Sequence, residues 1–252
     1  MQWSDEALVL QGSPYGESAR ILQLFTLERG RHAGLVRSRR KSGSECQPGN
    51  RVQVCWNARL EDHLGTLTLE ILRPTASLLF EDAPKLHAIS SACTLLSVTL
   101  PEREPYPELY LRVRAFLAVL ETDNPLWVAH YLALELELLA RLGYGLELGH
   151  CAATGAAEHL IYVSPKTGRA VSAAGGEPYK DKLLRLPPFL KKSAEGEVPA
   201  TLPGIAEIID GFRLTGYFLN KHIFSARNAM PAVRGRLMES FREQFNEQYE
   251  YA

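Results

Sequence analysis

The sequence is poor in cysteine. Only Cys46, Cys55, Cys93 and Cys151 occur in 252 residues, and no two of them form a Cys-x-x-Cys pair. This excludes a metal knuckle or a disulfide framework built from neighbouring cysteines. Because there is also no N-terminal signal peptide, we expect a cytosolic protein with reduced thiols. No apolar run reaches the roughly 20 residues that a membrane-spanning helix needs.

Catalytic motifs are also missing. The sequence has no phosphate-binding loop ending in Gly-Lys-Ser/Thr, no dinucleotide fingerprint and no His-Glu-x-x-His. The run "GSPYG" at 12–16 does not place its serine at the centre of a nucleophile elbow. Glu61 and Asp62 stand beside His63, where they are expected to bound a hairpin turn. The sequence therefore favours a protein that is not an enzyme. The alternative, a nuclease or RNA-modifying enzyme with a small barrel attached, would require a carboxylate cluster or a cofactor loop.

The charge is nearly balanced in total but uneven along the chain. The net charge is -1, and 46% of the residues are hydrophobic, as in an ordinary globular protein. Every charged residue between positions 29 and 41 is basic, whereas acidic residues gather between 102 and 147. This distribution predicts a basic surface on the N-terminal part and an anionic partner for it.

The first part of the chain, residues 1–80, has the pattern of a small β-barrel. Five short segments with strand character are separated by Gly-containing turns. In "RVQVCWNARL", Val52, Val54 and Trp56 alternate with polar residues, which is the period of a half-buried strand. Leu67, Leu69 and Ile71 repeat the pattern. We predict an OB-fold barrel, with an SH3-like barrel as the alternative that strand counting leaves open.

The remainder, residues 81–252, has helical periodicity and predicts an α+β protein of more than one domain, with an all-helical C-terminal part. One helix is well marked: Asn124 suits its cap, Pro125 its first position and Gly143 its end. A later helix is expected to begin near Thr201, and a last amphipathic helix near Pro231.

Residues 146–182 resemble a zinc ribbon without its ligands. Cys151 stands where a knuckle would begin, but Thr154 and Gly155 follow where Cys and Gly would be expected. With His150 and His159 the segment offers at most three ligands, and a structural zinc needs four. We therefore predict a hairpin near 160–171 within a metal-free, zinc-ribbon-like insertion that is held by packing.

The basic stretch is the strongest chemical signal, because it falls where a strand ends and an OB-fold loop begins. Guanidinium groups pair with phosphates and stack on bases, so we predict a nucleic-acid site there. A solvated loop without such a role is the alternative. A second basic group on the C-terminal helices carries less weight, because charges on helices usually face solvent. It comprises Arg213, Lys221, His222, Arg227, Arg234 and Arg236. The predicted nucleic-acid-binding residues are Arg29, Arg31, Arg37, Arg39, Arg40, Lys41, Lys221 and Arg227.

Several segments together resemble the RecO family of bacterial recombination-repair mediators, in its alphaproteobacterial form. They are "EALVLQGSPYGESARILQLFTLERGRHAGLVR", "QPGNRVQVCWNARLEDHLG", "ELELLARLGYGLELGHCAATG" and "VSPKTGRAVS". The resemblance covers nearly the whole chain. It implies an OB fold, a helical domain and a zinc-ribbon-like module, of whose four ligand positions only Cys151 is kept.

The resemblance also implies a function and partners. Members of this family bind single- and double-stranded DNA, anneal complementary strands and, with RecR, help RecA to displace single-strand-binding protein, in the cytoplasm and at the nucleoid. The single-strand-binding protein ends in an acidic tail with an apolar tip. The segment "YLRVRAFLAVLE" pairs cations with apolar residues, so Arg112, Arg114 and Phe116 are the predicted contacts for that tail. A purely structural adaptor remains a further alternative.

Overall fold

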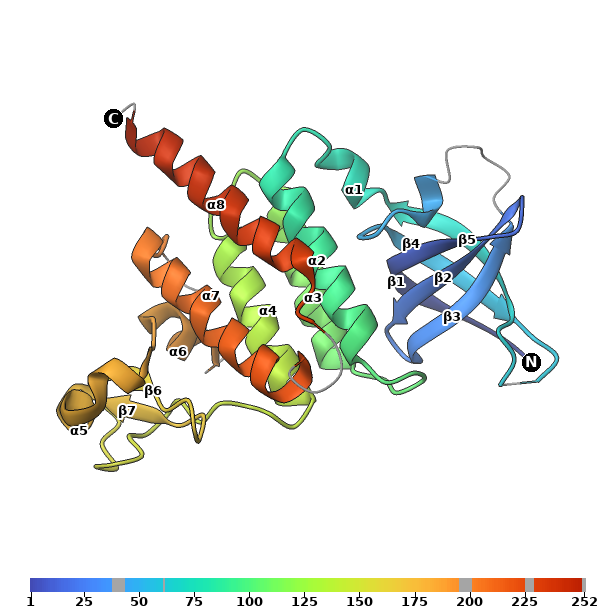
Figure 1. Cartoon of the computed structure of the whole chain (residues 1–252). Coiled ribbons are helices and arrows are strands. Elements are labelled where there is room, and N and C mark those ends of the chain that lie inside the picture. Colours follow the sequence, from blue (N-terminus) through green and yellow to red (C-terminus); the bar gives the residue numbers. More distant parts are fainter. Residues whose placement is uncertain (38–43, 61, 195–200, 225–228, 251–252) are drawn as a thin grey trace. The chain divides into compact units, whose positions relative to one another are not determined.

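The computed structural model describes residues 1–37, 44–60, 62–194, 201–224 and 229–250, with side chains through Glu243. The chain forms two compact units, Met1–Glu121 and Thr122–Ala252. The first unit contains the predicted barrel together with two long helices (Figure 1). Within the described residues, no helix is both long and apolar enough to cross a membrane.

The barrel of the first unit is closed, with the strand order β1-β2-β3-β5-β4 and a return from β4 to β1. All neighbours are antiparallel except β3 and β5, which run parallel. This Greek-key order is that of an OB fold and excludes the SH3-like alternative. The strands are β1 (Gln2–Tyr15), β2 (Ala19–Thr26), β3 (Gly30–Arg37), β4 (Arg51–Asn57) and β5 (Thr66–Arg73).

Alternation along the strands fills the barrel core, as predicted. Val52, Val54 and Trp56 of β4 are buried. Burying a side chain of this size contributes about 1.5–3 kcal/mol. On β5 the alternation weakens along the strand: Leu67 is buried, but Ile71 is 36% exposed. The far end of β5 therefore presents apolar surface instead of filling the core.

Two helices complete the first unit. After the short α1 (Thr75–Leu78) come α2 (Ala83–Thr99) and α3 (Pro107–Leu120). Helix α2 packs on β1 and β2, where the Ser97 hydroxyl donates to Gln23 at 2.7 Å. From α3, the Tyr110 ring lies 5.4 Å from that of Phe25 on β2. These contacts explain why the first compact unit extends beyond residue 80.

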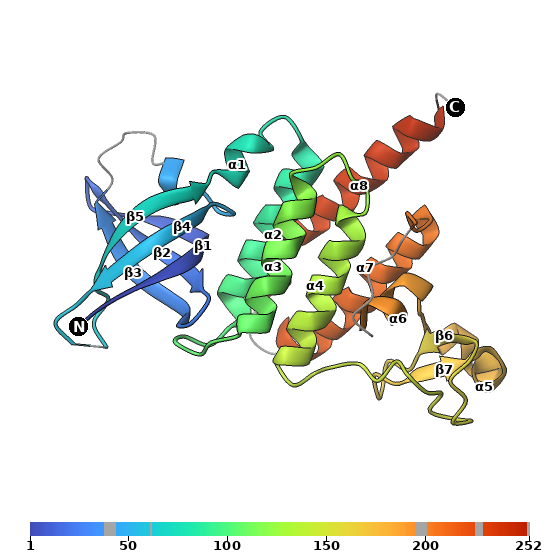
Figure 2. The ribbon, with the colours of Figure 1, turned by 180° about the vertical axis from the view of Figure 1, so that it is seen from behind.

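The second unit is built around α4 (Trp127–Arg141), α6 (Pro188–Ala194), α7 (Ile205–Leu219) and α8 (Ala232–Glu250), with a single π-helical turn at Asn220–Phe224 (Figure 2). Asn124 accepts the backbone N–H of Leu126 at 2.9 Å in the turn before α4. The prediction that Asn124 caps this helix and Pro125 takes its first position is wrong, because α4 begins at Trp127 with Leu126 as its N-cap. Gly143, with φ of +86°, follows its end as predicted. The prediction of a start near Thr201 is wrong: α7 begins at Ile205, because Glu207 reaches back to the N–H of Gly204 at 3.0 Å.

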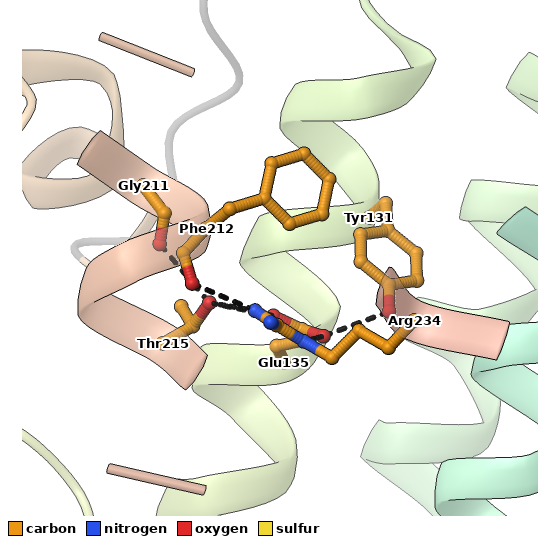
Figure 3. Close-up of polar contacts among 6 residues, drawn as sticks. All are labelled: Tyr131, Glu135, Gly211, Phe212, Thr215 and Arg234. Carbon is orange, nitrogen blue, oxygen red and sulfur yellow. Dashed lines mark hydrogen bonds and ion pairs between the residues drawn. The ribbon is translucent and has the colours of Figure 1, made fainter. Parts of the chain in front are cut away.

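A buried ion pair joins α4 and α8 to α7 (Figure 3). Arg234 donates to both carboxylate oxygens of Glu135, at 2.7 and 2.9 Å, and to the carbonyl of Phe212 at 2.9 Å. The hydroxyls of Tyr131 and Thr215 also donate to Glu135. Burial alone would lower the pKa of Arg234, but Glu135 raises it far above its usual range. The expectation that Arg234 belongs to a solvent-facing basic group is therefore wrong: its side chain is 9% exposed.

The insertion folds as a small three-stranded sheet, of order β7-β6-β8. Its strands are β6 (Leu160–Val163), β7 (Ala170–Ser172) and β8 (Leu184–Arg185), and α5 (Ala173–Gly176) and a 3-10 helix (Glu177–Lys182) lie between the last two. The predicted hairpin near 160–171 is confirmed. Gly168 ends its turn with φ of +72°, a conformation in which glycine has no steric penalty.

Candidate nucleic-acid interface

The barrel has a groove along the seam between β3 and β5. These strands pair only at Leu35 and Thr66, where the N–H of Leu35 donates to Gly65 at 2.9 Å. Beyond this point β5 diverges and leaves a groove of about 900 Å³. The lining residues are Leu35, Val36, Arg37, Glu45, Thr66, Leu67, Thr68, Leu69 and Ile71.

Arg37 ends β3 at the edge of this groove, and its side chain is exposed. The chain continues from there into Arg39, Arg40 and Lys41, which lie outside the described residues. The groove thus combines one cation and one carboxylate, Glu45, with hydroxyl and apolar side chains. Such a surface suits a strand whose phosphates are met by guanidinium groups and whose bases meet apolar walls.

The two arginines at the start of β3 differ in how far their guanidinium groups are engaged by other residues of the protein. Arg29 is exposed, and its guanidinium carbon lies 6.0 Å from the Trp3 ring. Arg31 donates to the Leu100 carbonyl at 2.8 Å and lies 3.3 Å from Glu102. These contacts of Nε and Nη1 connect β3 to the segment that follows α2, and that Arg31 also binds phosphate stays a prediction.

On the second unit, Lys221 is also engaged within the protein. Its ammonium group donates to the carbonyls of Pro165 and Lys166, at 2.7 and 3.0 Å, and so holds the hairpin turn of the insertion. It also lies 5.7 Å from the Phe218 ring. These contacts give Lys221 a structural role, and its phosphate contact stays a prediction. Arg227 lies outside the described residues.

The predicted partner-binding residues on α3 separate into two kinds. Arg112 and Arg114 are half-buried, and Arg114 lies 3.6 Å from the Glu6 carboxylate. Phe116 is fully buried. The prediction that Phe116 contacts a protein tail is corrected, because the helical stripe to which it belongs faces the interior.

The insertion keeps the spacing of the ligand positions of a zinc ribbon, but only one of these four positions is a cysteine. Cys151 and Thr154 have the spacing of one ligand pair, and Ser172 and Gly175 that of a second. The N–H and hydroxyl of Ser172 donate to the Cys151 sulfur, at 3.2 and 3.3 Å. A Cβ atom placed on Gly175 would lie 3.2 Å from the same sulfur. The four positions therefore surround one point in space.

These residues do not fit a structural zinc ion. Zinc in such sites takes four sulfur, imidazole or carboxylate ligands, and here one sulfur faces two hydroxyls and a glycine. Among the described residues, no group of three or more His, Cys, Asp or Glu side chains is placed to hold a metal. Burial would raise the pKa of the Cys151 thiol, but hydrogen bonds from Ser172, Thr154 and Ala153 outweigh it and lower the pKa to about 6. A buried, hydrogen-bonded sulfur thus occupies the centre of the ribbon.

Metal analysis tests this reading of the insertion. The purified protein is expected to contain well under one zinc per chain, and a chelator is expected to leave its melting temperature unchanged. The triple variant T154C/S172C/G175C supplies four thiolates and is expected to bind one zinc per chain and to melt lower in chelator. The variant A152C/S172C/G175C, with one thiol moved out of register, is the control. Stoichiometric zinc in the unmodified protein would contradict this account.

The chain is thus a protein with an N-terminal barrel of the OB type and a C-terminal helical unit that carries a ribbon-like insertion. The family model for the N-terminal part of Recombination protein O matches residues 1–75, and that for its C-terminal part matches residues 81–231. The chain belongs to this family, RecO.

Individual relatives agree with the family models. The chain is 46% identical over 248 residues to the DNA repair protein RecO of Rhodospirillum centenum, covering 96% of each chain. It is 46% identical over 242 residues to that of Methylorubrum populi, covering 94% of this chain and 97% of the relative. With the DNA repair protein RecO of a Ruegeria species it shares 42% identity over 244 residues.

Proposed function

We propose that this protein is a mediator of DNA repair and homologous recombination that binds DNA through its OB barrel and performs no bond chemistry. The observation that carries the proposal is Arg37 at the rim of the β3–β5 groove, from which the sequence continues into three further cations. The relatives named DNA repair protein RecO support the same role.

The chemistry of the groove suits binding without sequence readout. Cations follow the phosphate backbone and release counterions, while Leu69 and Ile71 offer apolar surface to bases. A mediator that must act on any sequence needs affinity of this kind. Because binding two strands on one protein raises their effective concentration, the same property favours annealing of complementary strands.

The proposed partners are single- and double-stranded DNA, RecR, the acidic tail of single-strand-binding protein and, indirectly, RecA. Arg112 and Arg114 on α3 remain candidates for contacts with the acidic tail, since their guanidinium groups can pair with carboxylates. Phe116 is not among the proposed contacts, because its side chain has no exposed surface.

The test removes the cations of the basic stretch. The variant R37A/R39A/R40A/K41A is expected to bind single strands of every sequence more weakly and with a flatter salt dependence. Each lost phosphate contact lowers the salt slope by about 0.7, so four contacts lower it by nearly three. The measurement is a binding titration at several salt concentrations, with thermal melting to verify folding.

The matched control removes the same charge from exposed positions of the insertion and α6, in the variant K166A/K180A/K182A/K192A. This variant is expected to keep the salt slope of the unmodified protein. If the first variant melts normally and keeps both affinity and slope, the groove is not the DNA site. A protein that shows no steep salt slope at all would be a structural adaptor.

A further inference from the structure

A second pocket lies where β3 begins. It has a volume of about 470 Å³, within the range of pockets that hold small ligands. Its lining comes from the start of β1, the β2–β3 turn, β3, β4 and the segment after α2, all within the first unit. Arg37 ends the same strand, so by strand rise the pocket lies roughly 20–25 Å from the groove cation.

Two stacked tryptophan rings form the floor of this pocket. Trp3 and Trp56 are directly opposite on β1 and β4, and their rings are stacked at 5.6 Å and 13°. Trp56 is 2% exposed and donates its indole N–H to the Leu64 carbonyl at 3.1 Å. Because Trp56 is fixed in this way, Trp3 is held from beneath while it remains partly exposed to the pocket.

His32 fixes the turn that carries the first cation. Its ring stands edge-on to Trp3 at 5.1 Å, and its Nδ1 lies 2.9 Å from the Arg29 carbonyl. Burial lowers the pKa of His32, and its Nδ1–H can donate to that carbonyl. Arg29 thus stands at the rim, with its guanidinium carbon over the Trp3 ring at 6.0 Å from the centroid.

The second cation is Arg103, whose backbone is strained. Its φ is +63°, a left-handed conformation that a non-glycine residue rarely adopts. The strain is held because the N–H of Arg103 donates to the Arg31 carbonyl at 2.8 Å. The guanidinium group lies 2.8 Å from the carboxylate of Asp62, which is 94% exposed. Strained residues that the surrounding structure holds in place are concentrated at functional sites.

We propose that this pocket binds one unstacked nucleobase that carries a phosphate, with Trp3 stacking on the base and Arg29 and Arg103 meeting the phosphate. An aromatic ring stacks on any base, and a guanidinium group recognises phosphate bidentately. The carboxylate of Glu28 also lines the pocket, so the rim suits one phosphate better than a run of them. The inference rests on the proposed function and adds a second contact at the opposite end of β3.

The first experiment leaves the pocket intact. The protein has three tryptophans, and the variant W127F retains only the two that line the pocket. Titration with a short thymidine strand is expected to quench their fluorescence and to protect them from acrylamide. Thymidine 5′-monophosphate is titrated in parallel. If only the strand saturates the fluorescence change, the pocket binds a base within DNA. If the strand and the mononucleotide both saturate it, the pocket binds single nucleotides as well. If neither ligand changes the fluorescence or the protection, the inference is overturned.

The second experiment compares W3A with W3F in strand binding. Loss of one stacked base lowers affinity about 5- to 150-fold, so W3A is expected to fall in this range while W3F stays close to the unmodified protein. F80A, which removes an aromatic ring that is 80% exposed elsewhere in the first unit, is the control. If W3A melts normally and binds as tightly as F80A, the pocket inference fails although the proposed function stands. If the unmodified protein binds no strand at all, the proposed function itself fails.

Discussion

Replacing Arg234 with alanine is expected to lower the free energy of unfolding by about 3–5 kcal/mol, because it leaves the carboxylate of Glu135 buried without its cation. Glu135 is 1% exposed and accepts from Arg234, Tyr131 and Thr215. The two hydroxyls cannot neutralise the charge. Chemical denaturation monitored by circular dichroism gives the measurement.

The neighbouring arginine on the same helix is the matched control. Arg236 is exposed, so R236A is expected to change the free energy of unfolding by no more than about 0.5 kcal/mol. The double variant E135L/R234M removes both charges and is expected to recover most of the loss, since an apolar pair of similar volume often replaces a buried ion pair without cost. Equal stabilities of R234A and R236A would contradict the role of the buried pair.

The variant G30A is expected to destabilise the protein by about 2–5 kcal/mol, which combines backbone strain with overpacking. Gly30 has φ of +68°, and an added Cβ would lie 1.9 Å from the carbonyl oxygen of Glu104. The added methyl group would meet backbone atoms, which cannot move away as the end of a flexible side chain could. Thermal and chemical denaturation both report the loss.

A substitution at Gly16 separates the contribution of backbone strain from that of overpacking. Its φ is +63°, nearly that of Gly30, but an added Cβ would meet nothing within 4 Å. G16A should therefore show only the conformational part, about 1 kcal/mol. If G30A and G16A are equally stable, the close approach of Glu104 to the turn has no energetic consequence.

The parts of the fold that depend on local pattern could be read from the sequence. Alternation in β4 identified Val52, Val54 and Trp56 as core residues, and all three are buried. The end of α4 follows the same logic, because Gly143 adopts the positive φ that ends a helix, whereas the predicted cap Asn124 lies in the turn before the helix. Local sequence determines such features since their partners are only a few residues away.

The roles of individual cations could not be read in this way. Arg234 and its partner Glu135 are 99 residues apart, and Lys221 reaches carbonyls 55 and 56 residues away. A basic residue on a helix looks the same in sequence whether it faces water or closes a buried pair. The Trp3 pocket was missed for the same reason, since its walls come from segments that only the barrel brings together.

The hydrogen-bonded sulfur of Cys151 has a consequence for how the folding of the second unit responds to its surroundings. A ribbon held by zinc gains stability by mass action, so its folded fraction rises and falls with the free metal concentration. In this protein the groups that surround the sulfur belong to the same chain, and their effective concentration does not change with growth conditions. We therefore expect metal starvation or chelation, which would unfold a zinc-bound ribbon, to leave the folding equilibrium of this one unchanged.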